Sequence, residues 1–311
     1  MIRNTMLPET MFGVRNVPWH GLGVQVEEAP TSAEAIKRAG LDWKVEPKKI
    51  FNDEGEEIPG FIANTRNTDG KVFGIVTGRY NIIQNEDAFS FTDALIGNDV
   101  RYETAGSLKG GRQIWLLARM PEREILGDKI DPYICFTNSH DGLGAVKVCM
   151  TPIRVWCSNT LNLALKKTNR MWTTRHIGNI ETKLQEAKVT LLHANEYMDE
   201  LNVTAEKLAE KKVTEAEIEA IFDSIYPIKE EDSLRKKNNV LDLKEELFRC
   251  YNMPDIVQFK GTAWGIVNAA TDMVAHSTPK RLTDSYQENN WGKIMTGHPF
   301  VDEIFNRVDV A

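Results

Sequence analysis

The chain has few cysteines, and their spacing excludes the sites that cysteine usually builds. Four cysteines are spread over 311 residues, with no CxxC pair and no spacing typical of zinc ligands. Cys135, Cys149 and Cys157 lie among apolar neighbours, where cysteine usually acts as a small hydrophobic residue. The pattern predicts neither a disulfide framework nor a metal site, and it favours a reducing, cytoplasmic compartment.

Long apolar runs are also absent. No stretch approaches the ~18 apolar residues that a membrane span requires, so no membrane partner is expected. The first residues, MIRNTMLPETMFG, lack the apolar core and small-residue cleavage site of a secretory signal. With 41% hydrophobic and 27% charged residues, the composition is that of an ordinary globular protein.

The familiar catalytic motifs are missing as well. We find no P-loop, no GxGxxG opening a helix after a strand and no HExxH, and the six histidines are scattered. His20, His140 and His276 could each be a ligand or a catalyst, but turn and helix-end positions are common for histidine. The sequence therefore indicates no catalytic residue and no cofactor, and an enzyme is the less favoured class.

One long stretch lacks acidic residues altogether. Between Gly142 and Ile180 there is no Asp or Glu, although the chain carries a formal net charge of −7. Its cations are Lys147, Arg154, Lys166, Lys167, Arg170 and Arg175. One interpretation is a solvated basic face without a partner. The other is a surface for an anion, in particular a nucleic-acid backbone.

Two tryptophans stand among these cations. Trp156 follows Arg154 closely, and Trp172 lies between Arg170 and Arg175. Aromatic rings among cations suit single strands, because bases stack on the rings while phosphates meet the cations. Strand alternation would place Arg154 and Trp156 on one face, although Trp156 could equally be a core residue. The predicted nucleic-acid site is Lys147, Arg154, Trp156, Lys166, Lys167, Arg170, Trp172 and Arg175.

Apolar and turn-forming residues predict an α+β fold with an antiparallel sheet. Hairpins are expected at 61–77, where Asn67 to Gly70 form the turn, at 101–118 and at 132–156. Such strands would form a sheet with helices packed on one face.

A helix is predicted from Asn85 to Leu95, and a second from a Ser158 or Asn159 cap through Leu165. Each helix follows a hairpin, so the sheet can be built from ββα units. To test for a duplication of such a unit, we compare the sequence with itself at an offset of 74 residues. Five identities align without gaps: Asn64 with Asn138, Gly70 with Gly144, Val72 with Val146, Thr77 with Thr151 and Asn85 with Asn159. Duplication and chance identity both remain open.

The C-terminal half is predicted to be helical and to pack back on the core. Apolar residues between 180 and 208 follow a 4-3-4-3 spacing, which suits either one helix on the protein's own core or a self-associating coiled coil. A capping box begins at Thr214, and 263–276 is apolar on nearly every side, as in a buried helix. We therefore divide the chain into an N-terminal arm (1–30), an α+β core (31–176) and a helical region (177–311).

Three segments resemble a known family. They are Pro18 to Gly23, Tyr80 to Asn85 and Thr151 to Leu161, with Gly261 to Gly265 similar to the C-terminal helix of that family. The family is the phage- and plasmid-borne group described as domain of unknown function 932. The resemblance implies a mobile-element context in a bacterial host cell, and it implies no activity and no catalytic residue.

Two classes of function follow. The first is a protein that binds single-stranded nucleic acid, or anneals it, in recombination or replication; a homo-oligomer would fit this class. The second is an accessory protein that binds a host factor or a nucleotide to counter host defence. Binding to single-stranded DNA at low salt, lost as salt rises, separates the two.

Overall fold

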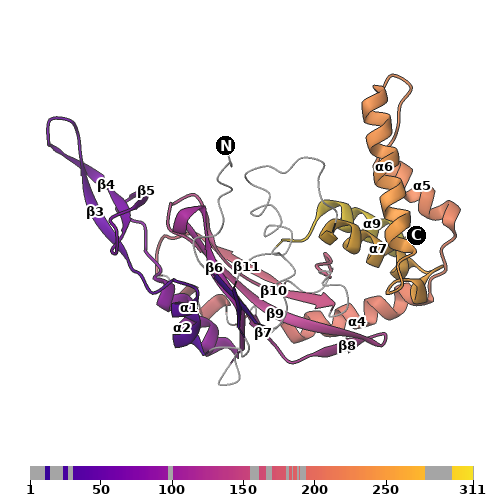
Figure 1. Ribbon diagram of the computed structural model, residues 1–311, viewed down its shortest axis with the longest axis horizontal. Helices are drawn as coiled ribbons and strands as arrows, with labels where there is room; N and C mark the ends of the chain where they lie inside the picture. Colours follow the sequence, from indigo (N-terminus) through magenta and orange to yellow (C-terminus); the bar gives the residue numbers. More distant parts are fainter. Residues whose placement is uncertain are drawn as a thin grey trace. The chain divides into compact units, whose positions relative to one another are not determined.

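The computed structural model describes most of the chain. The described residues are 11–14, 24–26, 31–96, 101–154, 161–165, 170–179, 182–183, 185–187, 189, 194–276 and 296–310. The chain forms two compact units (Figure 1). The first unit comprises Met1–Pro121, Pro132–Met150 and Asn169–Asn195, and the second comprises Glu122–Asp131, Thr151–Thr168 and Glu196–Ala311.

The described residues contain one large sheet of eight strands. Its order is β11-β10-β9-β7-β6-β1-β2, with β8 paired to β9. Most of the registered pairs are antiparallel, whereas β1 and β2 run parallel. The strands are β1 (Met11–Val14), β2 (Val24–Val26), β6 (Arg101–Leu108), β7 (Gln113–Arg119), β8 (Arg123–Ile125), β9 (Asp128–Ser139), β10 (Val146–Arg154) and β11 (Met171–Thr174). The predicted α+β class with an antiparallel sheet is confirmed.

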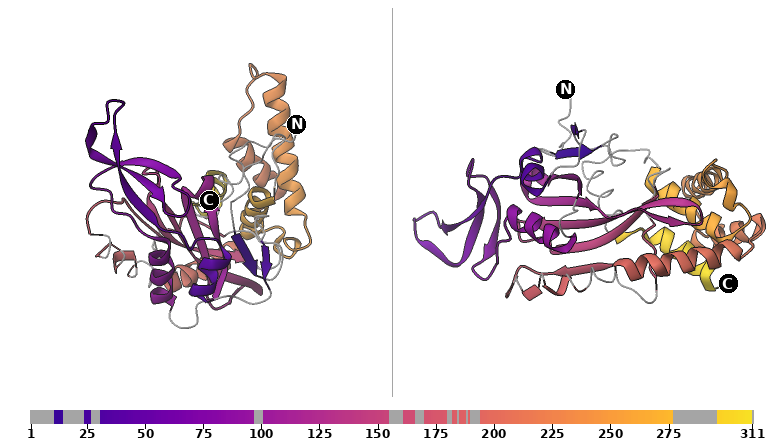
Figure 2. Two further views of the ribbon diagram at one scale, coloured as in Figure 1. Left: turned by 60° about the vertical axis from the view of Figure 1, so that its left-hand side comes forward. Right: turned by 90° about the horizontal axis from the view of Figure 1, so that it is seen from below.

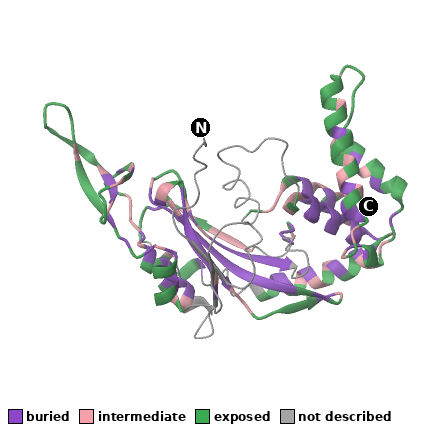
Figure 3. Cartoon of the chain, in the orientation of Figure 1, coloured by how far each residue is buried: buried purple, intermediate pink, exposed green. Residues whose placement is uncertain are grey.

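The centre of this sheet is buried on both faces. The residues of β7 from Ile114 to Ala118 and those of β9 from Ile130 to Ser139 are all buried (Figure 3). Two helices, α1 (Ser32–Arg38) and α2 (Asn85–Ile96), pack beside β6. The Tyr102 hydroxyl donates to the Asp93 carboxylate of α2 at 2.7 Å, which ties that helix to the sheet.

A small second sheet contains the first predicted hairpin. It consists of β3 (Val45–Phe51), β4 (Glu57–Arg66) and β5 (Val72–Thr77), in that order, and it stands apart from the large sheet (Figure 2). We expected one continuous sheet, and that expectation was wrong for β4 and β5. The reason is that their inner face packs on the turn after β9: the Asn64 amide donates to the His140 carbonyl oxygen at 2.9 Å.

The second unit is mainly helical. Its helices are α4 (Ala194–Glu210), α5 (Glu215–Ile225), α6 (Leu234–Tyr251), α7 (Ala263–His276) and α9 (Pro299–Val310). Helix α7 is buried from Ala263 to Met273, as its apolar sequence predicted. Between α6 and α7, the short 3₁₀ helix η2 (Val257–Phe259) contacts the start of β9, where Gln258 Nε2 donates to Asp128 Oδ1 at 3.4 Å.

The apolar stripe of α4 is covered within the chain. Leu201, Ala205 and Leu208 have no exposed surface, and Tyr197 and Met198 have almost none. This part of the 4-3-4-3 pattern is therefore core packing and does not offer a free seam for a coiled coil. Among the described residues, no helix is long and apolar enough to cross a membrane.

The predicted helix through Leu165 is wrong for its described part. Residues 161–165 are not helical, and the Tyr197 hydroxyl contacts their backbone, accepting from Leu163 N at 3.1 Å. Leu161, Asn162 and Leu163 are all buried. The backbone bonds run from Leu163 N to the Leu161 oxygen and from Leu165 N to the Leu163 oxygen, two residues back, and not four residues back as in an α-helix. Asn85 begins α2 as expected, but Asn159 lies outside the described residues, so the duplication is not confirmed.

Candidate functional site around His140 and His176

The segment from Tyr80 to Asn85, between β5 and α2, organises the polar interior of the first unit. Its backbone and side chains bond to residues more than 35 positions away in both directions along the chain. Because these partners come from β3, from the end of β9 with the turn after it, and from the chain after β11, one short segment brings three distant stretches together. We call it the 80–85 segment.

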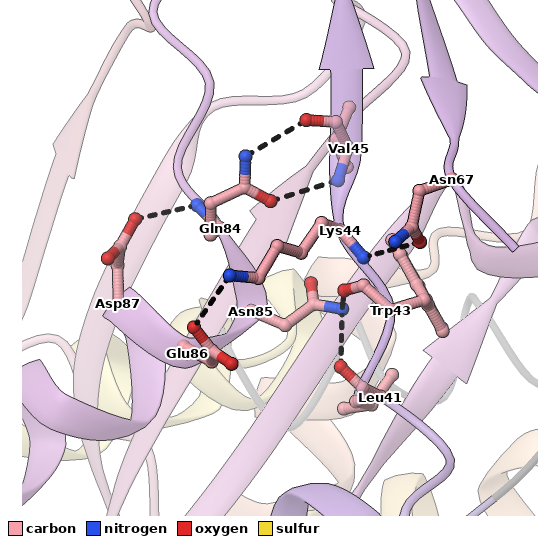
Figure 4. Close-up of polar contacts among 9 residues, drawn as sticks. All are labelled: Leu41, Trp43, Lys44, Val45, Asn67, Gln84, Asn85, Glu86 and Asp87. Carbon is pink, nitrogen blue, oxygen red and sulfur yellow. Dashed lines mark hydrogen bonds and ion pairs between the residues drawn. The ribbon is translucent and has the colours of Figure 1, made fainter.

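The side-chain amides of Gln84 and Asn85 hydrogen-bond this segment to the start of β3 and to the residues before it (Figure 4). Gln84 Oε1 accepts from the Val45 N–H at 2.9 Å, and Gln84 Nε2 donates to the Val45 carbonyl at 2.9 Å. The pair of bonds imitates that of a neighbouring strand. Asn85 Nδ2 donates to the carbonyl oxygens of Leu41 at 2.9 Å and Trp43 at 3.3 Å. The chain before β3 is thereby fixed on the N-terminus of α2.

His140 is completely buried beside this attachment. Its ring packs against Trp43 and Phe73, with centroids 5.4 Å and 5.6 Å away. The amide nitrogen of Asn85 is used by two carbonyls, so its oxygen faces His140, and His140 Nε2–H donates to it at 3.0 Å. Burial is the main cause that lowers the pKa of His140 to about 3. His140 is therefore a neutral structural histidine at pH 7.

His176 is held in a different way. Only 3% of its surface is exposed, and its ring stacks on Tyr80 with the centroids 4.5 Å apart. His176 Nδ1–H donates to the Asn81 carbonyl oxygen at 3.0 Å, whereas the buried Nε2 has no partner among the described residues. Burial outweighs that hydrogen bond and the nearby Asp141 carboxylate, so the pKa of His176 is lowered. At neutral pH its Nε2 is thus a free hydrogen-bond acceptor.

The turn after β9 brings a carboxylate to the same place. Asp141 Oδ1 accepts from the Ser139 hydroxyl at 2.5 Å and from the Leu143 N–H at 2.9 Å. The Tyr80 hydroxyl donates to the Ser139 carbonyl oxygen at 2.5 Å. Burial, with a further effect of Asp141, raises the pKa of Tyr80, so the phenol remains protonated and keeps this bond.

These groups line a pocket of about 410 Å³ in the first unit. Asp141, Tyr80 and His176 supply polar groups to its lining, and Arg175 adds an exposed cation. Apolar side chains with substantial exposure complete the lining: Phe61 (48%), Ile75 (61%), Leu143 (89%) and Ile177 (48%). The lining thus combines polar and apolar surface in similar amounts, and the volume of the pocket lies within the range of small-ligand sites.

The predicted nucleic-acid residues lie only partly at this pocket. Arg175 lines it. Arg170 is half-buried, and its Nη1 donates to the Met150 carbonyl oxygen at 3.2 Å. Arg154 is the last residue of β10. The residues outside the described part of the chain are Trp156, Lys166 and Lys167.

Lys147 and Trp172 are brought close together but on opposite faces. In the β10–β11 register Lys147 lies opposite Thr173, and Val148 lies opposite Trp172. Side chains alternate along a strand, so Lys147 and Trp172 point to different sides of the sheet. Both are half-buried. The described cations therefore do not form one continuous groove by themselves.

The sequence had pointed to the site only indirectly. His140 was interpreted mainly as a turn residue and His176 was not singled out, since their partners Asn85 and Tyr80 are 55 and 96 positions away. The one available signal was the resemblance of the 80–85 segment to a family, with no role attached to it. Among the described residues, no cluster of three or more His, Cys, Asp or Glu side chains is arranged to hold a metal ion.

The family model for the domain of unknown function DUF932 matches residues 72–292. This range covers well over half of the chain, and the chain belongs to that family. It includes Tyr80, Asn85, His140, Asp141 and His176. Comparison with curated proteins finds no match. Comparison with solved structures finds none either.

Proposed function

We propose that the chain binds single-stranded nucleic acid, with the pocket and the neighbouring β11 edge in the first unit as the contact surface. The observation that carries the proposal is that Arg175 and the half-exposed ring of Phe61 line the same pocket. An aromatic face can stack with an unpaired base while a guanidinium meets its phosphate. Duplex DNA hides its base faces, so this combination suits a single strand.

The distribution of charge supports the first unit as the contact surface. Its sequence contains 19 basic and 19 acidic residues, whereas the second unit contains 19 and 26. The whole formal charge of −7 is therefore carried by the second unit. A polyanion is repelled less by the first unit, and the acid-free stretch contributes Lys147, Arg170 and Arg175 to it.

The edge β-strand β11 would give single-stranded nucleic acid a path beyond the pocket. β11 ends the order of the large sheet in the described part of the chain. Trp172 in this strand is half-buried, and Arg175 directly follows the strand's last residue, Thr174. Neighbouring bases would stack on Trp172 and Phe61, and the backbone would run past Arg175.

The test is a fluorescence titration of the whole chain with a labelled oligothymidine at several salt concentrations. Each neutralised phosphate contributes about −0.7 to the slope of log affinity against log salt. Arg175→Gln should therefore make the slope shallower by about 0.7. Arg38→Gln removes an exposed cation at the end of α1 and should leave the slope unchanged. A folded protein that does not bind at about 50 mM salt excludes the proposal.

Trp172 allows a second measurement of the same proposal. Trp172→Ala should weaken binding by about 1–3 kcal/mol if a base stacks there, with the salt slope unaltered. Thermal melting is followed alongside, because a purely structural Trp172 would lower stability without changing the affinity of the protein that remains folded.

A second candidate is the binding of a free nucleotide, as in an accessory protein of a mobile element. The pocket favours it, because about 410 Å³ lies within the usual range for small-ligand sites. Mononucleotides that compete fully with the oligonucleotide, combined with a salt slope near −1, would support this candidate over strand binding.

A further inference from the structure

The small sheet has two edge strands in the described part of the chain, and the two differ in how they are protected. Its order is β3-β4-β5, so β3 and β5 are the edges. β3 carries Pro47, Lys48 and Lys49, and proline and lysine on an edge strand discourage pairing with a further strand. β5 reads VFGIVT and carries neither a charge nor a proline. The sequence of β5 therefore does not oppose the addition of a strand.

The register of β5 shows which of its backbone groups face away from β4. Gly78 N donates to the Gly60 carbonyl oxygen at 2.9 Å, so Thr77, one residue back, belongs to a non-hydrogen-bonded pair with β4. Such pairs alternate with hydrogen-bonded ones, so the backbone groups of Ile75 also face outward. The Thr77 carbonyl accepts from Tyr80 N at 2.9 Å. The Ile75 N–H and C=O and the Thr77 N–H have no partner among the described residues.

The pocket lies along this same edge. Ile75 and Thr77 line it, and both are exposed, Ile75 at 61%. Phe61 pairs with Thr77 across the sheet, so its half-exposed ring lies on the same face. Leu143 and Ile177 add exposed apolar walls from other segments. A strand paired to β5 lies about 4.8 Å from it, which brings alternate side chains of the added strand into the pocket.

Arg175 gives the pocket a charge that a ligand can neutralise. Its side chain is exposed, and among the described residues its guanidinium has no hydrogen bond or ion pair. The Asp141 carboxylate of the same lining is already bonded within its own turn, to Ser139 and Leu143. A guanidinium pairs well with a carboxylate. A ligand with an acidic side chain therefore fits the pocket.

We propose that the free edge of β5 binds an extended peptide segment of a partner protein by β-strand addition. The peptide backbone pairs with Ile75 and with the Thr77 N–H, alternate apolar side chains enter the pocket beside Phe61, and an acidic side chain meets Arg175. In this mode the main-chain bonds give affinity and the pocket gives specificity. Nucleic acid offers no matching row of N–H and C=O groups, which favours a peptide at this edge.

The peptide site does not depend on the proposed function. Only one expectation rests on it, namely that peptide and single-stranded nucleic acid exclude each other. Both ligands contact Phe61 and Arg175, which line one pocket. A partner that presents such a segment would thus control access of nucleic acid to the pocket.

The probe is a labelled peptide of about six residues, the usual length of a strand, in which valine alternates with threonine and the last threonine is replaced by aspartate. Its fluorescence anisotropy with the whole chain measures binding. Ile75→Lys places on β5 the kind of charge that protects β3, and it should weaken binding about tenfold or more. Ile58→Lys is the matched control, because Ile58 is an exposed isoleucine (38%) of β4 that is not part of the pocket lining. Thermal melting of both variants confirms that they are folded.

Methylation of the peptide backbone tests strand pairing itself. The valine nitrogens are methylated in one peptide and the threonine nitrogens in another. Successive N–H groups of a strand point to opposite edges, so only one of the two sets faces β5. One methylated peptide should lose about tenfold in affinity, as expected for a lost hydrogen bond, and the other should bind nearly as before. Equal losses, or none, would overturn the inference.

Arg175→Gln tests the charge. It should weaken binding of the aspartate peptide about two- to fivefold, as for an exposed ion pair, and leave the all-threonine counterpart unchanged. No saturable binding by the folded chain at about 1 mM peptide, or binding that Ile75→Lys leaves intact, would also overturn the inference. Light scattering that gives twice the mass of one chain, reduced to one chain by Ile75→Lys, would assign the edge to a second copy instead.

The outcome is separable from that of the proposed function. Peptide binding without oligothymidine binding removes nucleic-acid binding and leaves β-strand addition standing. Oligothymidine binding without peptide binding does the reverse. If both ligands bind, each should displace the other, and binding of both without displacement would refute their shared use of Phe61 and Arg175.

Discussion

The two units differ in how their buried polar side chains are hydrogen-bonded. The first unit buries asparagines and histidines in a network, in which Asn85 links His140 to the carbonyls of Leu41 and Trp43. In the second unit the helices bury apolar stripes such as Leu201, Ala205 and Leu208 of α4, and the polar residues that α7 buries, such as Asn268 and Thr271, bond to carbonyls of their own helix. Charge differs as well, since the net charge of −7 belongs entirely to the second unit.

The comparison suggests where function lies. A buried histidine with an unpartnered nitrogen costs stability, and such groups persist where a ligand or a specific conformation requires them. In the first unit His176 Nε2 and His140 Nδ1 are both buried nitrogens without a partner among the described residues. Of the two histidines, His176 lines the pocket. The pocket proposed as the binding site lies in the first unit.

The largest effect is expected from adding one carbon at two glycines. A Cβ on Gly74 would lie 2.4 Å from the Asp141 carbonyl oxygen, and a Cβ on Gly265 would lie 2.4 Å from that of Phe259. Since the clashing atoms are backbone, the segments must separate. We expect Gly74→Ala and Gly265→Ala each to cost about 3–4 kcal/mol, the former in the first unit and the latter in the second.

Hydrogen exchange read by mass spectrometry distinguishes the two units. Faster exchange confined to the unit that carries the substitution would show that the units unfold separately. Gly78→Ala is the control, because the nearest atom to its Cβ is 3.7 Å away. If Gly74→Ala is as harmless as Gly78→Ala, the contact between β5 and the turn after β9 is not formed.

The second prediction concerns the amide of Asn85. Asn85→Ala should cost about 2–3 kcal/mol, because it leaves the Nε2–H of buried His140 and the Leu41 carbonyl without their partner. Asn67→Ala, which removes an exposed amide that accepts from Lys44 N, should cost well under half as much. Chemical denaturation of both variants is the measurement, and equal losses would contradict the network.

The third prediction is a pH dependence of the first unit. The pKa of His140 is about 3 in the folded protein and about 6.5 when unfolded, so the unfolded state binds more protons between these values. Stability from this group is complete above pH 6.5 and is lost as the pH falls toward 3. At pH 5 the loss is about 2 kcal/mol, and the lowered pKa of His176 adds to it in the same direction.

The measurement is denaturation at pH 7.5 and pH 5. His140→Gln should be less stable at pH 7.5 but should lose less between the two values. His276→Gln in the second unit, whose side chain is partly exposed, should keep the full dependence. A wild-type pH dependence that His140→Gln leaves unchanged would show that another group causes it.

Which features the sequence predicted correctly depends on how far apart in the chain the contacting residues lie. The Asn67–Gly70 turn, the capping box at Thr214 and the buried helix 263–276 rest on neighbouring residues, and the structure confirms them. The separate small sheet does not follow from local pattern, because the β4–β5 hairpin has the same alternation in either sheet. Its placement depends on Gly74 meeting Asp141, 67 positions away.

The contacts of the candidate site could not be predicted from local sequence either. The acid-free stretch drew attention to Arg175 but gave no reason to expect it beside Tyr80 or His176. Those contacts arise when the 80–85 segment lies against the chain after β11, where Asn81 N donates to the His176 carbonyl oxygen at 2.9 Å. A long-range contact between two loops has no periodic signal in the sequence.

The smallest expected effect compares the two capping boxes, one in each unit. In the second unit the Thr214 hydroxyl accepts from the Glu217 N–H at 3.2 Å, while the Thr214 N–H donates to the Glu217 carboxylate at 2.7 Å. Thr31 in the first unit bonds the Glu34 carboxylate more weakly, at 3.1 Å from its N–H. Thr214→Ala should cost about 1 kcal/mol and Thr31→Ala less. Exchange rates in the first turns of α5 and α1 measure both losses, and a larger effect at Thr31 would mean that its box is the tighter of the two.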